Sequence, residues 1–288
     1  MNGFSIGEAW SQAVAFLSAH FKMILIYAAA GVLLPLVIQL LLIGGTLESM
    51  LDPQAIIASG DNPFAALGAF GAGFVVAAIL GQIIQSASYY ASWRHGLSGG
   101  TEEPASTVTY ALGAAAMWLI ATIVLVIAAV LLIGLPLGLL GAGAAAGGDA
   151  SSLGGLFLIL IPVMFFLFLW LGARLSVIGP AMADARSVNP LYGIAASWRL
   201  TGPSQWPILG YMVVLLIGFI VLAMILGMIA AIGMIGAAGA GGELSAGMFI
   251  GTMISGIIAG IPIALAYVAI PAGIYRTLVP NNAGDVFA

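Results

Sequence analysis

The chain has 288 residues, of which 62% are hydrophobic and 6% are charged, and it carries a net charge of −4 and no cysteine. Soluble globular proteins draw about a quarter of their residues from the charged types, so this composition excludes a soluble protein. The sparse basic residues form no cluster that could meet phosphates, which excludes a nucleic-acid partner, and the lack of cysteine excludes disulfides and thiolate metal ligands.

The first predicted element is an amphipathic helix over residues 5–21. Ser5 and Glu8 stand at the spacing of a capping box, in which each side chain bonds the backbone amide of the other residue. Apolar side chains then recur at helical spacing, namely Ile6, Trp10, Ala13, Leu17 and Phe21. We expect this helix to lie in the membrane interface; the alternative is a solvent-exposed leader that packs on the bundle.

Six apolar segments follow, and each is long enough to cross a hydrocarbon core of about 30 Å, which takes about 20 helical residues. They lie near 23–45, 64–90, 111–142, 156–178, 206–235 and 247–273. Proline removes a helix hydrogen bond, so the prolines inside these segments should kink their helices. These are Pro35, Pro136, Pro162 and Pro262. The stretch 134–141 could form a broken helix or the kinked end of a long one. The sequence predicts an all-α, polytopic membrane helix bundle that forms a single domain over residues 1–288.

Two further short helices are predicted before the third and fifth apolar segments, over residues 102–110 and 189–200. Thr101 and Pro104 are start signals for the first, and Asn189 followed by Pro190 is the same kind of signal for the second. Each short helix would precede a span that leaves the basic side of the membrane. The segment order therefore suggests a threefold repeat of helix-hairpin units, each with an interfacial helix, an outgoing span and a returning span.

The basic residues fall in or beside alternate gaps between the apolar segments. They are Lys22, Arg94, Arg174, Arg186, Arg199 and Arg276. The other gaps, over 46–63, 143–155 and 236–246, hold only acidic charges. Because cytoplasmic loops of membrane proteins carry an excess of lysine and arginine, we expect both termini to face the cytoplasm.

Polar groups are sparse inside the apolar segments, and no ionisable residue lies near the middle of one. Arg174 comes nearest, and we expect its side chain either to extend to the cytoplasmic interface or to bind a lipid phosphate or a carboxylate such as Asp184. Gln82 and Gln85 make the inner half of segment 64–90 the most polar embedded stretch. Hydrogen bonds between helices would explain them, and a substrate path is the alternative.

Recognisable catalytic motifs are missing from the sequence. The two histidines, His20 and His95, fall in predicted interfacial segments, so the chain has no zinc-binding HExxH helix, and a membrane serine nucleophile would lack a histidine partner. We therefore expect no enzyme activity, no metal site and no cofactor. A membrane enzyme that uses Asp184, Arg186 or His95 at the cytoplasmic face is kept as a third hypothesis.

Residues 173–202, ARLSVIGPAMADARSVNPLYGIAASWRLTG, combine an apolar stretch, a proline, an acid and a short amphipathic segment. The positions that carry the pattern are Pro180, Asp184, Ser197, Leu200 and Thr201, with Gly202 following. This pattern resembles the signature of YciC-like inner-membrane proteins and of the membrane domain found beside some glycerophosphoryl diester phosphodiesterases. The resemblance implies a bacterial inner-membrane location and a protein without a settled biochemical role. Phosphodiesterase activity belongs to a separate soluble domain, for which the longest gap, 179–205, leaves no room.

We predict a non-enzymatic integral membrane protein whose partners are membrane lipids or another membrane protein, contacted through its cytoplasmic face. The candidate binding residues are Arg94, Arg174, Asp184, Arg186 and Arg199. The alternative is a small transporter for an apolar or amphipathic solute, which the glycine and proline interruptions and the pair Gln82 and Gln85 favour.

Overall fold

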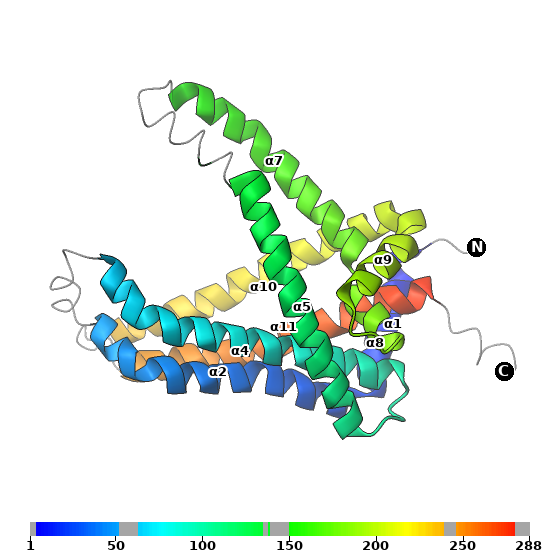
Figure 1. Cartoon of the computed structure of the whole chain (residues 1–288), viewed down its shortest axis with the longest axis horizontal. Coiled ribbons are helices and arrows are strands. Elements are labelled where there is room, and N and C mark those ends of the chain that lie inside the picture. Colours follow the sequence, from blue (N-terminus) through cyan, green and yellow to red (C-terminus); the bar gives the residue numbers. More distant parts are fainter. Residues whose placement is uncertain (1–3, 52–62, 135–137, 139–149, 239–245, 280–288) are drawn as a thin grey trace, which may run out of the picture.

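The computed structural model describes residues 4–51, 63–134, 138, 150–238 and 246–279, and its regular elements in these ranges are all helices (Figure 1). Six helices are long and apolar enough to cross a membrane. They are α2 (Phe21–Leu51), α4 (Pro63–Leu97), α5 (Pro104–Ala129), α7 (Ala150–Leu175), α10 (Gln205–Ala238) and α11 (Ala246–Leu278). The prediction of an all-helical chain with six helices suited to span a membrane is confirmed for the described residues.

The remaining elements are short. They are α1 (Ile6–Ala19), a π-helical turn after α5 (Val130–Gly134), α8 (Ile178–Asp184), α9 (Pro190–Thr201) and a 3₁₀ turn before α10 (Gly202–Ser204). The sequence did not predict α8 as a helix of its own. Most of the stretch 134–141, for which we weighed a broken helix, lies outside the described residues, as does Pro136.

The spans turn large apolar side chains outward. Phe168 on α7 is 64% exposed, and Leu41 on α2 and Ile217 on α10 are exposed in the same way. In water such a surface would cause aggregation, whereas lipid tails cover it without penalty. The outer surface of the spans therefore fits hydrocarbon as its surroundings.

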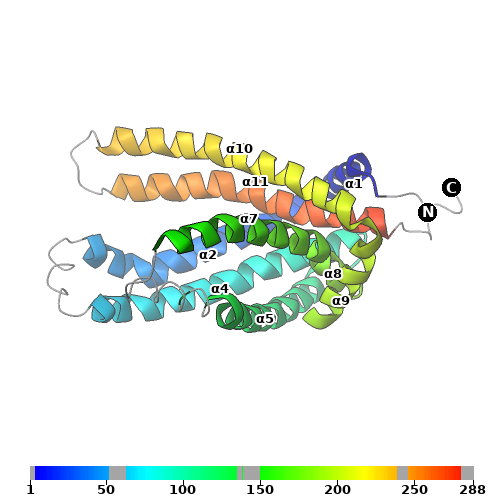
Figure 2. The ribbon, with the colours of Figure 1, turned by 90° about the horizontal axis from the view of Figure 1, so that it is seen from above.

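The spans α2, α4, α10 and α11 run alongside one another, while α5 and α7 cross this group at an angle (Figures 1 and 2). Small residues allow the close approach of α2 to its neighbours. Gly81 of α4 lies against Pro35, and Gly260 of α11 lies against Val32, where an added methyl group would sit 3.4 and 3.0 Å from these side chains. Such contacts replace the hydrophobic drive that lipid cannot supply.

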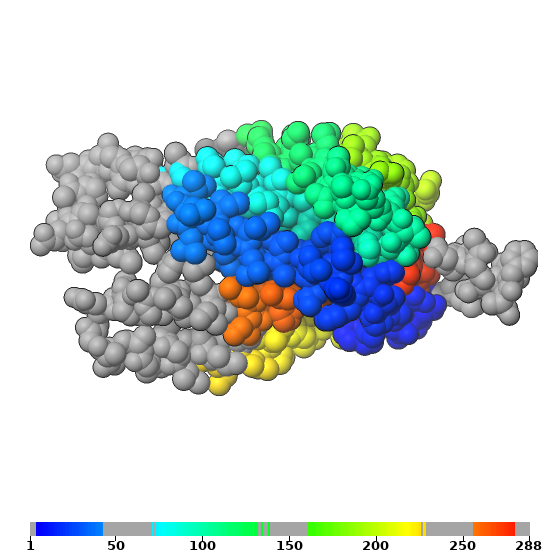
Figure 3. Space-filling model, turned by 90° about the horizontal axis from the view of Figure 1, so that it is seen from below, coloured from blue at the N-terminus to red at the C-terminus, as the bar shows by residue number. Residues whose placement is uncertain are grey.

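The helix α1 packs on the bundle, beside α2 and α11, through two alanines and the fully buried Phe16 (Figure 3). Ala9 and Ala13 are buried against α11, where a methyl group added at Gly273 would collide with their backbone atoms. The opposite side of α1 exposes apolar residues, among them Trp10, which is 54% exposed. The helix therefore packs on the bundle and also offers an apolar face to its surroundings.

Two details of the predicted short helices are wrong. Ser5 is the N-cap of α1, but its side chain makes no capping hydrogen bond, so the expected capping box is not formed. The segment 102–110 is not a separate helix, because α5 begins at Pro104 and continues into the span. Its N-cap is Glu103 and not Thr101, and α5 has no interior proline that would break it. The threefold repeat stays a prediction, and its second unit lacks a separate interfacial helix.

The start of α9 follows the prediction. Asn189 is the N-cap, and its Oδ1 accepts a hydrogen bond of 3.0 Å from the amide of Leu191. Pro190 occupies the first helical position, where its missing amide costs nothing and its fixed φ suits the helix. Residues 189–200 therefore form the short helix that the sequence indicated.

All six basic residues lie at one end of the bundle, where α1, α8 and α9 gather with the loop of residues 98–103 (Figure 1). We call this the basic end. The gathering of the bases at this end follows from the chain order, because α4, α7 and α11 end there while α2, α5 and α10 begin there. The alternate gaps that hold the bases therefore meet at a single end of the fold.

Candidate functional site

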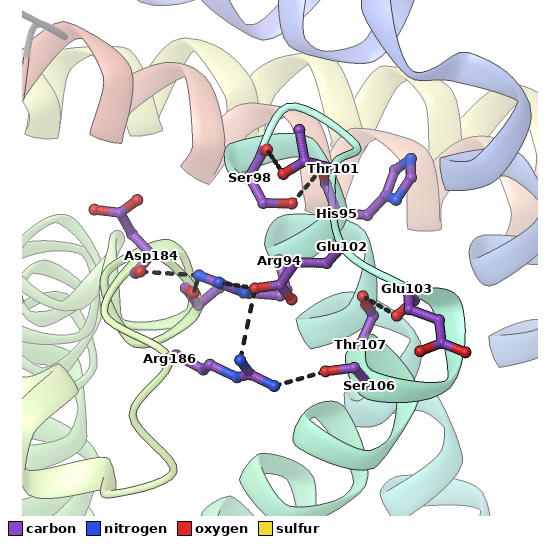
Figure 4. Close-up of polar contacts among 11 residues, drawn as sticks. Arg94, His95, Ser98, Thr101, Glu102, Glu103, Ser106, Thr107, Asp184 and Arg186 are labelled. Atoms are coloured by element: carbon purple, nitrogen blue, oxygen red, sulfur yellow. Dashed lines mark hydrogen bonds and ion pairs between the residues drawn. The ribbon is translucent and has the colours of Figure 1, made fainter. Parts of the chain in front are cut away.

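Arg94 joins the end of α4 to the end of α8 at the basic end (Figure 4). Its Nη1 donates hydrogen bonds to the carbonyl oxygens of Ala183, at 2.8 Å, and Asp184, at 3.0 Å. Its Nη2 forms an ion pair with Glu102 in the loop before α5. Because most of its donors are used inside the protein, Arg94 has little left to offer a lipid or a partner.

Glu102 accepts a hydrogen bond from Arg94 and lies near a second arginine, Arg186. Arg186 approaches with its Nη1 at 3.9 Å from Oε1 of Glu102, and its Nη2 donates to Oγ of Ser106 at 2.6 Å. The hydrogen bond from Arg94 is the main cause that lowers the pKa of Glu102 below its ordinary value of 4.5. This carboxylate is 17% exposed and connects the loop of residues 98–103 to Arg94 at the end of α4.

Asp184 faces α11. Its Oδ2 accepts a hydrogen bond of 2.8 Å from the hydroxyl of Tyr275. This bond connects α8 to α11, as the contacts of Arg94 connect α8 to α4. Arg94, Asp184 and Arg186, three of the candidate binding residues, therefore lie close together, but the first two serve contacts within the protein.

Arg174 lies elsewhere at the basic end, at the last turn of α7. The residue is only 6% exposed, and its guanidinium stands over the ring of Trp198 from α9, 4.2 Å from the ring centre. The edge of a second ring, Trp170, meets Trp198 at 5.6 Å between centres. Nε and Nη1 of Arg174 find no hydrogen-bond partner among the described residues.

Two of the expectations for Arg174 are wrong, and the third, that it binds a lipid phosphate, stays a prediction. The side chain does not extend to the surface, because Trp198 covers it, and it does not bind Asp184, which bonds to Tyr275. A cation over an aromatic face is stabilised by the ring quadrupole, and the effect grows when water is excluded. In this structure Arg174 therefore contributes to the packing of α7 against α9.

The residues that carried the family resemblance have structural roles here. Oγ of Ser197 and Oγ1 of Thr201 both donate to the carbonyl oxygen of Arg174, at 2.8 and 3.0 Å. Ser197 and Thr201 are fully buried, and these bonds satisfy a carbonyl that the end of α7 leaves without a helical donor. The Ser-x-x-Leu-Thr pattern thus fixes α9 to the end of α7.

Three basic side chains remain available at the basic end. Lys22 and Arg199 are exposed and make no hydrogen bond or ion pair with any described residue, and Arg186 is 54% exposed. Exposed aromatic side chains accompany them, including Trp198 and Trp206. Bases beside exposed tryptophans are typical of the headgroup layer of a membrane.

A second candidate site lies between the spans. A central chamber of about 460 Å³ is lined by residues of α4, α5, α7, α8 and α11. On one side it adjoins an α2 chamber of about 360 Å³, between α2, α4 and α11. On the other side it adjoins an α10 chamber of about 460 Å³, between α7, α10 and α11. We call the three chambers together the crevice.

Shared lining residues show that the chambers adjoin. Gln82, Gln85 and Tyr89 line both the α2 chamber and the central chamber. Tyr267 and Ser176 line both the central chamber and the α10 chamber. The rings of Tyr89 and Tyr267 lie against each other with their centres 4.6 Å apart, so this pair stands where the chambers meet.

The hydrogen bond between helices that the sequence analysis expected is not found for Gln82 among the described residues. Nε2 of Gln82 donates to Oγ of Ser86 at 3.1 Å, and both residues belong to α4, so this bond is not between helices. The side chain of Gln82 is exposed. The sequence indicated the polar wall of α4 but gave no sign of Ser176 or Tyr267, since only helix packing brings α7 and α11 to that wall.

Among the described residues, no three histidine, aspartate or glutamate side chains gather as metal ligands would. No protein-family model, curated protein or solved structure matches this chain. The resemblance to YciC-like proteins stays a prediction, and the argument for function depends on the basic end and the crevice.

Proposed function

We propose that this protein is a non-enzymatic, lipid-contacting protein of the bacterial inner membrane, with both termini in the cytoplasm. In this proposal the basic end lies at the depth of the lipid headgroups. The bases that meet anionic lipid are Lys22, Arg186 and Arg199, whereas Arg94, Arg174 and Asp184 hold the basic end together. Another membrane protein could bind the same surface, and the proposal assigns no catalytic step to the chain.

One observation carries the proposal: at the end of the bundle where apolar side chains are also exposed, Lys22 and Arg199 are exposed without an ion pair to any described residue, and Arg186 stays 54% exposed beside Glu102. On α9, Leu191 and Trp198 point outward near Arg199, and on α1 Trp10 does so. Water would not favour this combination, while the headgroup layer accommodates both kinds of group. Each base near an anionic membrane surface contributes attraction of about 1 kcal/mol.

Lipid retention in native mass spectrometry tests this proposal. The protein is reconstituted in nanodiscs of phosphatidylcholine and phosphatidylglycerol, released into the gas phase, and compared with the triple variant Lys22→Gln/Arg186→Gln/Arg199→Gln. We expect the variant to lose most of its preference for phosphatidylglycerol. The control Lys22→Arg/Arg186→Lys/Arg199→Lys keeps the charges and should keep the preference. Equal retention by all three proteins would contradict the proposal.

A second candidate function, transport of an apolar or amphipathic solute, is favoured by the crevice. Transporters bind their substrates between helices near the middle of the membrane, and the wall formed by Gln82 and Gln85 belongs to a span. Time-dependent uptake of a fluorescent fatty alcohol into the inner leaflet of protein-containing liposomes would support transport. Uptake at the same rate in protein-free liposomes would exclude it for that solute.

A further inference from the structure

The crevice carries uncharged polar groups at a depth where few should remain unpaired. Gln82 is exposed and uses one donor on Ser86, and Gln39 of α2 is exposed on the other side of the α2 chamber. Tyr267, between the central and α10 chambers, is 54% exposed. Burying an amide or hydroxyl in hydrocarbon without a partner costs about 2 kcal/mol or more, so these groups favour a hydrogen-bonding occupant over lipid tails alone.

Prolines add acceptors along the same walls. Pro271 lines the central and α10 chambers and has no amide to bond the carbonyl of Tyr267 one turn before it. Pro35 lines the α2 chamber and in the same way leaves the carbonyl of Gly31 without its helical donor. Both carbonyls therefore lack the amide donor that the helix would normally supply four residues later.

The lining also limits the charge of an occupant. Among the described residues that line the three chambers, none is aspartate, glutamate, lysine, arginine or histidine. An ionised headgroup would therefore enter a weakly polar site without a counter-charge, which is strongly unfavourable. The occupant that fits is neutral.

The α10 chamber differs from the other two. Apart from shared residues at its border, its walls are apolar, with Phe168 and Leu169 from α7 and Met212, Leu215 and Phe219 from α10. It adjoins the polar walls through Ser176 and Tyr267. A polar site joined to an apolar one is suited to a molecule that has both parts.

We propose that the crevice binds an uncharged amphipathic molecule, with its hydrogen-bonding head beside Gln82, Gln85 and Ser86 and its aliphatic tail in the α10 chamber. Chambers of several hundred cubic ångström match the usual size of small-molecule sites. The aromatic pair Tyr89 and Tyr267 lies between head and tail. This inference does not rest on the proposed headgroup contacts, because it uses none of the bases at the basic end.

Photolabelling of the full chain in phosphatidylcholine nanodiscs tests this site. The probe is a monoacylglycerol that carries a diazirine in its acyl chain. We expect saturable labelling, with the labelled peptides on the chamber-lining parts of α7 and α10. Unlabelled monoacylglycerol should compete about tenfold better than lysophosphatidic acid with the same chain, because the phosphate brings an unpaired charge. Unsaturable labelling spread over the outward faces of all spans would overturn the proposal.

Two matched pairs of variants localise the labelling. Gly172→Leu fills the α10 chamber, and the control Gly218→Leu adds the same side chain on α10 outside the crevice; an added Cβ meets no atom within 4 Å at either position. The pair Gln82→Leu/Gln85→Leu removes the polar wall, and Thr122→Val on α5 is its control. We expect labelling to fall at least about fivefold in the test variants only, since they remove the space or hydrogen-bonding partners of the ligand.

Each result has a defined meaning. Equal labelling of Gly172→Leu and Gly218→Leu, with both eluting as the wild type does in size-exclusion chromatography, would overturn the site. The triple variant Lys22→Gln/Arg186→Gln/Arg199→Gln should label as the wild type does. A loss of labelling in this triple variant would mean that the probe binds at the basic end and not in the crevice. The two proposals can therefore fail separately.

Discussion

The basic end and the crevice use polar side chains in opposite ways. At the basic end, the ionised groups of Arg94 and Glu102 are largely buried and bond to one another or to backbone carbonyls. In the crevice the polar groups are neutral, and Gln82 and Tyr267 face open space. The pair Arg94 and Glu102 thus holds short elements together, while the proposed ligand would meet uncharged groups, of which Gln82 makes one bond, to Ser86. Substitutions at the basic end should therefore change stability, and those in the crevice should change binding.

The largest effect is expected at Arg94. In Arg94→Leu, the carboxylate of Glu102 and the carbonyls of Ala183 and Asp184 lose their donor in a largely buried site. Removing one partner of a buried ion pair costs about 3 kcal/mol or more. We expect a clear fall in the melting temperature of the detergent-solubilised protein, followed by fluorescence-detected size-exclusion chromatography.

The double variant Arg94→Leu/Glu102→Leu is the control for this effect. It removes the stranded carboxylate, so it should melt above the single variant. Arg199→Gln also removes one positive charge but breaks no internal contact, and its melting temperature should stay at the wild-type value. If Arg94→Leu melts as the wild type does, Arg94 does not hold the basic end together.

A smaller effect is expected from glycine positions in the two regions. Gly273→Ala adds a methyl group that collides with the backbone of Ala9 and Ala13 in α1, which should cost about 1–3 kcal/mol. Gly172→Ala in the crevice meets no atom within 4 Å, and alanine favours a helix by about 0.5–1 kcal/mol over glycine. Melting temperatures should fall for the first and hold or rise for the second. The reverse order would remove the contrast between a tight basic end and an open crevice.

The sequence predicted the features that depend on local signals. Hydropathy indicated the spans, the spacing of bases indicated a common end, and Asn189 with Pro190 indicated the start of α9. The burial of Arg174 could not be predicted, because Trp198, which covers it, follows 24 residues later on another helix. The crevice could not be predicted either, because its walls come from helices that are far apart in the chain. For the same reason Gln82 and Gln85 alone could not distinguish helix packing from a ligand site.

The pH dependence of the basic end gives a third test. Glu102 has a pKa below its ordinary value of 4.5, mainly because Arg94 hydrogen-bonds to its ionised form. The resulting stability is complete above the ordinary pKa and is lost as the pH falls through the lowered pKa of the folded protein. The melting temperature of the wild type should therefore fall below about pH 4.5, and that of Glu102→Gln should fall less over the same pH interval. Parallel pH profiles for the two proteins would show that this carboxylate does not stabilise the basic end.

The smallest effect is expected at Arg186, which has the left-handed φ of 51° at the end of α8. The amide of Ser187 donates to the carbonyl of Met182 and that of Arg186 to the carbonyl of Ala183, which is the pattern of a Schellman cap. Glycine adopts this conformation without the cost of about 1 kcal/mol that other residues bear, but Arg186→Gly also loses the bond to Ser106. The two changes should nearly cancel, so Arg186→Gly should melt close to the wild type. Arg186→Ala loses the bond and keeps the strain, so it should melt below Arg186→Gly. Equal melting of the alanine and glycine variants would mean that backbone strain at the end of α8 adds nothing to the stability of the basic end.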